Sequence, residues 1–405
     1  MRAVIEKSNL KGHMDAPPSK SISHRSLICA GLAQGKSRIE NVIESEDLLA
    51  TMDCLRTLGV KIEKCGTTIL VEGIGGTRKV EEAVLFCRES GSTLRFLLPI
   101  CAALGIKTRF KGEGRLLSRP MDGYKDCMKE QGLVYEKRAD DIFIEGQLKG
   151  GSFSIRGDVS SQFISGLLFA LPLLQEDSVI HILPPVSSRS YINLTIQSLK
   201  KAGIQIEWIK ETELLVKGQQ GYQCIQEEVE GDASNAAFFE ALNFLGFDVE
   251  VSGLKEDSRQ GDRIYKRLFL ELQEGMPRIS LKDCPDLGPI LFALAAEWNG
   301  AIFTDTERLR LKESDRVASM KAELEKMHAS IEVEENFVKI APSCLRKPEK
   351  KLDGHNDHRI VMALSVLLLK YGGEVQGVEA VRKSMPDFFD KLIGLGAKIY
   401  IEEEM

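Results

Sequence analysis

The sequence predicts an α+β fold of two lobes, built from a repeated unit in which a helix is followed by two short strands. Four stretches share this pattern, each with a helical run, a strand, a polar turn and a second strand: 58–73, 131–146, 202–218 and 329–342. The first three close on a glycine and are spaced about 70 residues apart, a period longer than that of ordinary solenoid repeats. We therefore predict a duplicated α+β unit and not a stacked array.

The first copy shows why these residues favour these elements. Ser45 is predicted to cap a helix whose apolar residues lie on one face, at Leu48, Met52 and Leu55. Gly59 supplies the left-handed residue that ends the helix. Val60 and Ile62 then alternate with charged residues, which is the period of a strand with one buried face, and the dipeptide at 65–66 makes the turn back. The helix is expected to cover one face of a sheet.

Two polar segments indicate where the chain crosses between larger lobes. They are 15–18, where Pro17 and Pro18 fix an extended backbone, and 228–232. We therefore predict a discontinuous lobe of residues 1–17 plus 231–405 and an inserted lobe of residues 18–230.

Charge and hydropathy exclude several classes of protein. The chain has 54 Lys plus Arg against 60 Asp plus Glu, a net charge of -6, which gives no overall footprint for nucleic acid. The longest apolar runs, 163–174 and 360–369, are shorter than the roughly 18 residues that a membrane helix needs. The chain begins directly with a strand-like run and no leader pattern, so we expect it to work in the cytoplasm. Its partners are expected to be small molecules, with neither nucleic acid nor membrane.

The nine cysteines are scattered without a CxxC pair. This pattern favours reduced and mostly buried thiols over disulfides or a zinc site. The cysteines thus predict neither a disulfide framework nor a zinc site.

Several predicted helix starts combine hydroxyl side chains with cations. In segment 19–25, Lys20 and Arg25 lie within a turn and a half of Ser19, and similar starts occur at 89–95 and 158–162. Free N–H groups and the positive end of a helix dipole favour a phosphate or carboxylate there. Ser and Gly at such positions can also be simple caps, which leaves both interpretations open.

The second lobe places acids beside bases at three helix starts: 283–286, 312–316 and 356–359. Ser314 or Asp315 could cap the second of these helices, whose Val317, Met320 and Leu324 are expected to face inward. A solvated run of charges is the alternative for 312–316, and a cap is the alternative for Asp286.

Nine motifs in the right order, over nearly the whole chain, resemble the 5-enolpyruvylshikimate-3-phosphate (EPSP) synthase family. Besides the segments above, they include Arg119-Pro120, 160–163, 230–234, 285–286, 311–316 and 383–389. The resemblance implies six copies of a small βαβαββ unit, three in each of two lobes, with the active site between the lobes. At 405 residues, six copies would be about 67 residues each.

The resemblance also implies a reaction and its participants. The enolpyruvyl group of phosphoenolpyruvate would move to the 5-hydroxyl of shikimate 3-phosphate with release of phosphate, a step in the shikimate pathway to chorismate and aromatic amino acids. Lys and Arg would supply the positive charge, so no metal or other cofactor is implied. The enzyme is expected to act as a monomer.

Site residues follow by matching the motifs position by position. The implied shikimate 3-phosphate site is Lys20, Ser21, Arg25, Ser160, Ser161, Gln162, Ser188, Asp286 and Lys312. The implied phosphoenolpyruvate site is Lys20, Gly91, Arg119, Gln162, Arg316, Arg359 and Lys383. Asp286 is the implied base and Glu313 the favoured acid, while Lys20 and Lys383 are further candidates for moving protons.

Two departures and two alternatives accompany the resemblance. Glu89 and Phe96 stand where the family usually has Asn and often Pro, which leaves sensitivity to glyphosate open. UDP-N-acetylglucosamine enolpyruvyl transferase is the nearest enzyme alternative, but its usual loop cysteine is missing from 111–122, and Cys127 lies beyond the loop. A non-catalytic phosphometabolite-binding protein is the other alternative, and it is opposed by the presence of both Asp286 and Glu313.

Overall fold

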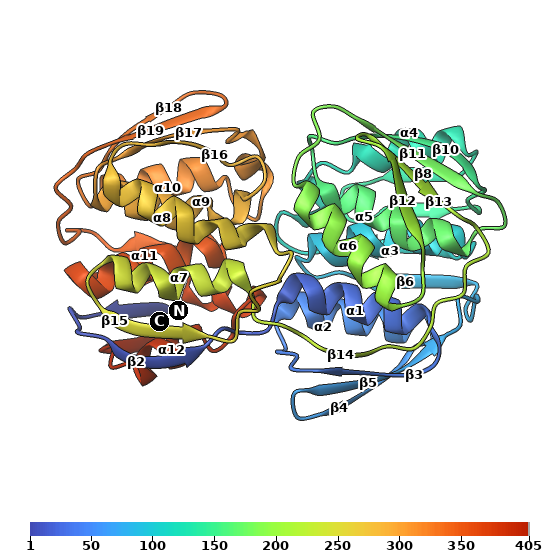
Figure 1. The fold of residues 1–405 in the computed structure, drawn as a ribbon, viewed down its shortest axis with the longest axis horizontal. Helices are drawn as coiled ribbons and strands as arrows, with labels where there is room; N and C mark the ends of the chain where they lie inside the picture. Colours follow the sequence, from blue (N-terminus) through green and yellow to red (C-terminus); the bar gives the residue numbers. More distant parts are fainter. Residues whose placement is uncertain (404–405) are drawn as a thin grey trace. The chain divides into compact units, whose positions relative to one another are not determined.

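The computed structural model describes residues 1–403. These residues form two compact lobes. The split lobe combines Met1–Pro17 with the chain from Gly231 onward, and the inserted lobe is Pro18–Glu230. Figure 1 shows both lobes as layers of helices and small sheets.

The inserted lobe contains three four-stranded sheets. Their strands are β3 (Gln34–Glu40), β4 (Lys61–Cys65), β5 (Thr68–Ile74), β6 (Glu82–Phe86), β7 (Lys107–Lys111), β8 (Val134–Lys137), β9 (Ile142–Glu145), β10 (Gly151–Arg156), β11 (Ser178–Leu183), β12 (Ile206–Lys210), β13 (Glu213–Val216) and β14 (Gln226–Glu228). The helices are α1 (Lys20–Leu32), α2 (Glu46–Thr57), α3 (Gly91–Ala103), α4 (Asp122–Glu130), α5 (Ser161–Ala170) and α6 (Arg189–Lys201).

The three sheets of the inserted lobe share one topology. Their strand orders are β6-β7-β9-β8, β10-β11-β13-β12 and β14-β3-β5-β4. In each sheet the first two strands are parallel and the last two form an antiparallel hairpin. The third sheet takes its first strand, β14, from the far end of the lobe, so the chain enters and leaves the lobe beside the same sheet.

The split lobe repeats the same topology in two sheets. Its strands are β1 (Arg2–Ile5), β2 (Lys11–Asp15), β15 (Asp248–Ser252), β16 (Arg278–Ser280), β17 (Ala301–Thr304), β18 (Ser330–Val333), β19 (Phe337–Ala341), β20 (Leu352–Asp353), β21 (Gly373–Gln376) and β22 (Ile399–Glu402). The helices are α7 (Ala233–Phe244), α8 (Tyr265–Glu274), α9 (Gly288–Glu297), α10 (Arg316–Glu325), α11 (His358–Tyr371) and α12 (Phe388–Gly394).

The predicted α+β architecture of repeated units is confirmed, with one copy reduced. Sheets β16-β17-β19-β18 and β20-β21-β1-β22 have the four-stranded order, the second with β1 taken from the start of the chain. The remaining sheet of residues 1–403 pairs only β15 with β2, in parallel. This sixth copy therefore keeps its helices α7 and α8 and its parallel strands but has no hairpin.

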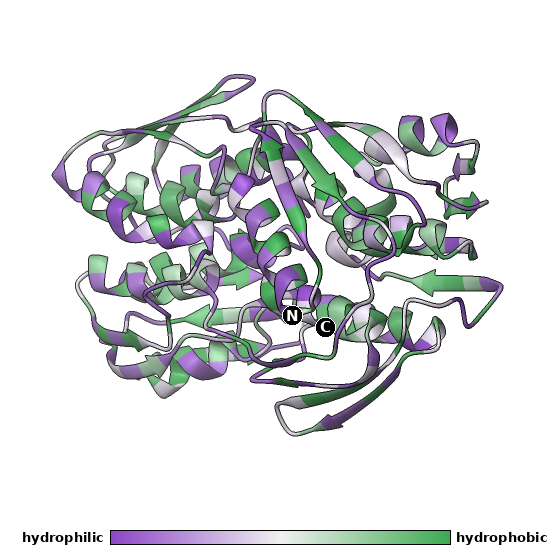
Figure 2. Cartoon of the chain, turned by 45° about the vertical axis from the view of Figure 1, so that its right-hand side comes forward, coloured by the Kyte–Doolittle hydropathy of each residue, from purple (hydrophilic) through white to green (hydrophobic). Residues whose placement is uncertain are grey.

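Each lobe has its own apolar core, and alternate helices run through it. Along α9 and α11 nearly every residue is buried, and α7, α9 and α11 contact one another. A helix that is apolar on all sides belongs in a core, whereas helices such as α4 and α8 bury one face. Figure 2 shows hydrophobic and hydrophilic residues both occurring along the strands, as expected where helices cover one face of a sheet.

The local predictions for the first copy are confirmed. Ser45 Oγ accepts a hydrogen bond from the Leu48 backbone N–H and caps α2, and Gly59 ends the helix with a φ of 97°. All nine cysteines are free, and Cys65, Cys224 and Cys344 are the exposed ones. No helix within residues 1–403 is long and apolar enough to cross a membrane.

Candidate active site

Arg119 and Lys383 lie at the ends of short 3-10 helices, Leu116–Ser118 and Val378–Lys383. The other predicted site residues lie at or near the N-terminal ends of helices in both lobes. In the inserted lobe they lie at the starts of α1, α3, α5 and α6, and in the split lobe at or just before the starts of α9, α10 and α11. Backbone N–H groups at such ends have no partner within the helix, and they favour an anion. We call the two groups the inserted-lobe cluster and the split-lobe cluster.

Lys20, in the inserted-lobe cluster, forms an ion pair that the sequence did not indicate. Its Nζ lies 2.8 Å from Asp47 Oδ2 on α2, and both side chains are mostly buried. The Asp47 backbone carbonyl lies 3.4 Å from the hydroxyl oxygens of Thr51 and Thr93, and Thr93 Oγ1 donates to Ser90 Oγ at 2.7 Å. This network ties the start of α1 to the turn that precedes Gly91.

His24 closes this network from the interior. Its Nδ1 lies 2.8 Å from Thr51 Oγ1, and its Nε2 has no hydrogen-bond partner in the described chain. Burial lowers the pKa of His24 well below 6.5, and Lys20 and Arg25 lower it further. His24 is therefore a neutral structural residue and not a source of positive charge.

Arg25 is buried and fixed in position by α6. Its Nε donates to Thr195 Oγ1 at 2.9 Å, and its terminal nitrogens donate to the backbone carbonyls of Ser21 and Tyr191. Burial lowers the pKa of Arg25 to about 10, so the guanidinium remains charged at neutral pH. The side chain thus presents a fixed cation between α1 and α6.

Gly91 lies against two guanidinium groups. A Cβ added at Gly91 would lie 2.8 Å from Arg95 Nη1 and 3.1 Å from Arg119 Nη1. Arg95 Nη1 also donates to Gln162 Oε1 at 2.7 Å, and Gln162 Nε2 donates to Ser92 Oγ at 2.8 Å. Glycine at this position lets the start of α3, Arg119 and Gln162 approach closely.

The remaining predicted residues of the inserted lobe are serines at helix starts. Ser160 caps α5 by accepting a hydrogen bond from the Gln162 N–H, and Ser161 is the buried first residue of that helix. Ser188 precedes α6 with a φ of 54° and is 1% exposed. A buried serine in left-handed backbone needs support from its surroundings, which is typical of a functional turn.

Asp286 is the centre of the split-lobe cluster. Its Oδ1 accepts hydrogen bonds from Lys312 Nζ at 3.0 Å and Arg316 Nη1 at 2.9 Å, and its Oδ2 lies 3.9 Å from Arg359 Nη2. Burial alone would raise the pKa of Asp286, but Lys312, Arg316 and Arg359 together hold it well below 3.8. Asp286 makes no capping hydrogen bond, so the cap interpretation is wrong for this residue.

Arg316 joins three carboxylates although it is only 1% exposed. Its Nε donates to Asp357 Oδ2 at 2.8 Å, and its Nη2 donates to Glu313 Oε2 at 2.9 Å, besides the contact with Asp286. Burial lowers the pKa of Arg316, but these three carboxylates raise it above its ordinary value. The arginine is therefore charged, and it fixes both predicted proton-transfer carboxylates in place.

Ser314 and Asp315 divide the roles that the sequence left open. Asp315 caps α10 by accepting from the Ala318 N–H at 3.0 Å, while Ser314 Oγ donates to Asp357 Oδ2 at 3.1 Å. Val317, Met320 and Leu324 are buried as predicted. The segment is thus an ordered ion-pair network, and the solvated-run interpretation of 312–316 is wrong.

The last two cations are held by backbone and amide oxygens. Arg359 Nη1 donates to Asn235 Oδ1 on α7 at 3.1 Å, and the guanidinium lies 5.7 Å from the centre of the Phe238 ring. Lys383 Nζ donates to the Asn356 carbonyl at 2.7 Å. Lys383 thereby lies beside the same helix start that carries Arg359.

The lowered pKa of Asp286 predicts a pH dependence of stability. Because its folded pKa lies below 3.8, the ion pairs stabilise the fold at pH values above 3.8, and this contribution is lost as pH falls through the folded pKa. The difference in unfolding free energy between wild type and Asp286→Asn should be constant from about pH 5 to 7 and shrink below about pH 4. Urea unfolding at a series of pH values measures it, and a difference that stays constant down to about pH 3 would contradict this prediction.

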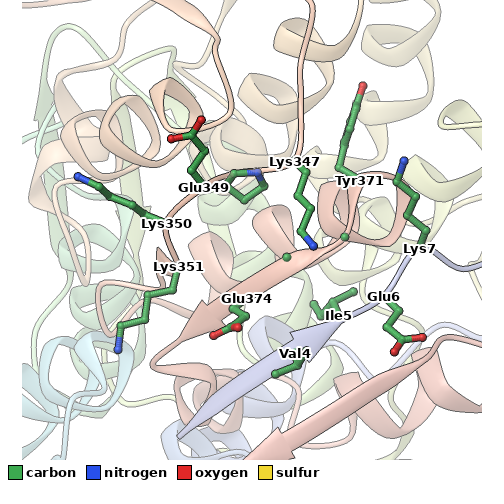
Figure 3. A pocket seen from close by; sticks show the side chains of 13 residues that line it. Val4, Ile5, Glu6, Lys7, Lys347, Glu349, Lys350, Lys351, Tyr371 and Glu374 are labelled. Atoms are coloured by element: carbon green, nitrogen blue, oxygen red, sulfur yellow. The ribbon is translucent and has the colours of Figure 1, made fainter.

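An open pocket of the split lobe lies among lysines (Figure 3). It encloses about 590 Å³, and its lining includes Lys7, Lys347, Lys350, Lys351 and Glu374. No predicted site residue of the described chain lines it. The pocket borders the segment that leads into β20.

Comparisons with known proteins agree over the full length. Residues 4–392 match the family described as EPSP synthase (3-phosphoshikimate 1-carboxyvinyltransferase). A protein of that name from Clostridium kluyveri is 39% identical over 422 residues, covering 98% of this chain and 97% of the relative.

Solved structures show the same fold. The EPSP synthase from Acinetobacter baumannii has a TM-score of 0.79 at 22% identity, with 99% of each chain covered. The enolpyruvyl transferase NikO from Streptomyces tendae has a TM-score of 0.76 at 14% identity, with 98% of each chain covered.

Proposed function

The chain belongs to the EPSP synthase family, whose members transfer the enolpyruvyl group of phosphoenolpyruvate to shikimate 3-phosphate in aromatic amino acid biosynthesis, and we propose that it does so with the residues of the two clusters. The observation that carries this proposal is the split-lobe cluster, in which Lys312, Arg316 and Arg359 converge on Asp286. Cations gathered around a carboxylate at helix starts suit an anionic substrate that reacts by proton transfer.

The inserted-lobe cluster is proposed to bind shikimate 3-phosphate. Its donors are Lys20, Ser21, Arg25, Ser160, Ser161, Gln162 and Ser188, and Asp286 and Lys312 of the split lobe would hold the substrate at its hydroxyls. Phosphate suits the starts of α1, α5 and α6 because their N–H groups and nearby cations favour a dianion. Lys20, Gly91, Arg119, Gln162, Arg316, Arg359 and Lys383 are proposed to bind phosphoenolpyruvate.

Asp286 is proposed as the base that takes the proton of the 5-hydroxyl. While Lys312, Arg316 and Arg359 are directed at it, its pKa lies well below 3.8, which makes it a weak base. An anionic substrate that binds these cations would share their charge and raise the pKa of Asp286. The arginines would thus link substrate binding to activation of the base.

Glu313 is proposed as the acid that protonates the methylene carbon. It lies 2.9 Å from Arg316 Nη2 and next to Lys312 in the chain. Protonation of the double bond and attack by the 5-hydroxyl would give a tetrahedral intermediate that carries a methyl group. Loss of phosphate, together with return of one methyl proton to the Glu313 carboxylate, would then restore the carbon–carbon double bond and complete the transfer. Lys20 and Lys383 are further candidates for moving these protons.

The full-length match favours this reaction over transfer to UDP-N-acetylglucosamine. Loop 111–122 has no cysteine, and Cys127 is buried on α4, where burial raises the pKa of its thiol to about 12. A thiol with that pKa is a poor acid or nucleophile at neutral pH.

Phosphate release with both substrates tests the proposal. Release should need shikimate 3-phosphate and phosphoenolpyruvate together, and UDP-N-acetylglucosamine should not replace the first. Equal release with either acceptor, or release from phosphoenolpyruvate alone, would contradict it.

Gly91→Ala is expected to raise the KM for phosphoenolpyruvate about tenfold with little change in the KM for shikimate 3-phosphate. The added Cβ would meet the guanidinium nitrogens of Arg95 and Arg119, which must then move away from the start of α3. Gly221→Ala is a matched control, because a Cβ at Gly221 has no atom within 4 Å. Unchanged steady-state kinetics in Gly91→Ala would remove this glycine from the proposed site.

The cytoplasm is the proposed location. A monomer is the proposed active form, because all of the proposed site residues belong to one chain. Activity that falls with dilution below the concentration at which the enzyme dissociates would contradict the monomer.

A further inference from the structure

A strained turn links the end of β20 to the start of α11. His355 and Asn356 have φ values of 49° and 51°, so two successive residues other than glycine adopt left-handed backbone. Such conformations cost free energy and persist where the surroundings hold them. The turn is followed directly by Asp357 and by the first residues of α11.

The turn sets the direction of two groups of the split-lobe cluster. The Asn356 carbonyl accepts the hydrogen bond from Lys383 Nζ, and the Asp357 carboxylate accepts from Arg316 Nε at 2.8 Å. A change in the backbone at 355–356 would therefore move the acceptors of both cations. Lys383 and Arg316 are residues assigned above to phosphoenolpyruvate.

A buried carboxylate on α10 holds the turn. Glu323 has a side-chain exposure of 2%, and it accepts hydrogen bonds from the Asp353 N–H at 2.8 Å, His355 Nε2 at 2.9 Å and Lys326 Nζ at 2.7 Å. Asp353 Oδ1 in turn accepts from the His355 N–H at 2.7 Å. The turn is thus fixed at its side chain and at its backbone.

Helix α10 connects this contact to the site. Arg316 is the first residue of the helix and Glu323 lies seven residues later, about two turns along the same face. One rigid helix therefore positions both Arg316 and Glu323. Glu323 in turn holds the 355–356 turn that leads into Asp357, the partner of Arg316.

We propose that Glu323 and His355 are positioning residues for phosphoenolpyruvate: their contact holds the 355–356 turn so that Lys383 and Arg316 keep the orientation that binds this substrate. This inference rests on the assignment of Lys383 and Arg316 above. The groups that face His355 are Glu323 of α10, Lys326 directly after that helix and Asp353 of β20.

The contact also predicts a dependence on pH. The hydrogen bond with Glu323 raises the pKa of His355 above 6.5, and Asp353 adds to this effect although burial and Lys326 oppose it. A raised histidine pKa means that the charge-assisted contact is complete below pH 6.5 and weakens as pH rises through the folded pKa. Phosphoenolpyruvate binding should weaken over the same range.

Two substitutions test the positioning role. Glu323→Gln removes the charge at nearly constant volume, and His355→Asn keeps a residue that tolerates left-handed backbone but is too short to reach Glu323. Both variants should raise the KM for phosphoenolpyruvate about tenfold and leave the KM for shikimate 3-phosphate within about twofold. Glu325→Gln, an exposed residue of the same helix paired with Lys321, is the matched control and should behave as wild type.

Lys383→Met, measured in parallel, separates this inference from the site assignment. If Lys383→Met raises the KM for phosphoenolpyruvate while both test variants stay within about twofold of wild type, the positioning role is overturned. If Lys383→Met has no effect on that KM, the assignment of Lys383 fails instead. A loss of thermal stability with unchanged kinetics would mean that the contact is only structural, and it too would overturn the proposal. Should Glu323→Gln fail to fold, His355→Asn decides.

The pH profile tests the charge. The value of kcat/KM for phosphoenolpyruvate in wild type, divided by the value in His355→Asn, should fall toward one as pH rises from about 6 to 9. The comparison cancels the ionisation of the substrate, which is common to both enzymes. A ratio that stays constant over this range would overturn the role assigned to the charge of His355.

Discussion

Asp286→Asn is expected to lower kcat by about a hundredfold or more, because the amide cannot accept the proton of the 5-hydroxyl. The substitution preserves volume and leaves Lys312, Arg316 and Arg359 with less negative charge near them. Affinity for the anionic phosphoenolpyruvate should therefore be kept or increased while turnover collapses. Steady-state kinetics, together with direct titration of phosphoenolpyruvate binding, measure these effects.

Asp283→Asn is the matched control for this substitution. Asp283 lies three residues earlier in the same loop and is exposed, so its loss should change the rate little. A general loosening of the loop would slow both variants, whereas loss of a base slows only Asp286→Asn. Turnover within about threefold of wild type in Asp286→Asn would exclude Asp286 as the base.

The parts of the fold that the sequence predicts are those fixed by neighbours in the chain. The Ser45 cap and the left-handed Gly59 follow from residues a few positions away, and the structure has both. The repeated α+β unit could be recognised because the same helix–strand–turn–strand pattern recurs. The reduced sixth copy could not, because strand β2 pairs with β15 more than two hundred residues later.

The sequence likewise indicates some residues of the candidate site and not others. Motifs at helix starts indicated Asp286, Arg316 and Arg359, and these residues lie together. The sequence does not indicate the partners that hold the site residues, because each partner lies far away in the chain. Asp47, which contacts Lys20, has the sequence signal of an ordinary acidic residue in a first helical turn. Asn235, which contacts Arg359, has that of an ordinary helix residue.

The same limit explains why the sequence leaves open whether an acidic residue at a helix start is a cap or a catalytic carboxylate. An acidic residue before an apolar run has the same sequence signal whether it binds N–H groups or side chains. Asp357 does cap α11, through the Arg359 N–H, and it also binds Arg316. Within residues 1–403, Asp286 contacts the side chains of Lys312, Arg316 and Arg359 and caps no helix, and this difference depends on where α10 and α11 pack.

Arg316→Met is expected to destabilise the fold by about 3–5 kcal/mol, the range found when one partner of a buried ion pair is removed. Methionine fills much of the space but leaves Asp357, which is fully buried, without its main cation. Urea unfolding measures the loss. Arg310→Met is the control, because Arg310 is 30% exposed and its side chain binds mainly backbone carbonyls of a surface turn.

A second substitution separates the charge from the volume of Arg316. Asp357→Asn, added to Arg316→Met, removes the uncompensated buried charge and keeps an oxygen that can cap α11, so it should restore part of the lost stability. The double variant should nevertheless fail to bind phosphoenolpyruvate tightly, because the cation at this position is still absent. If Arg316→Met alone unfolds within about 1 kcal/mol of wild type, the three carboxylates do not depend on this arginine. If the double variant recovers full affinity for phosphoenolpyruvate, Arg316 supports the fold and does not bind the substrate.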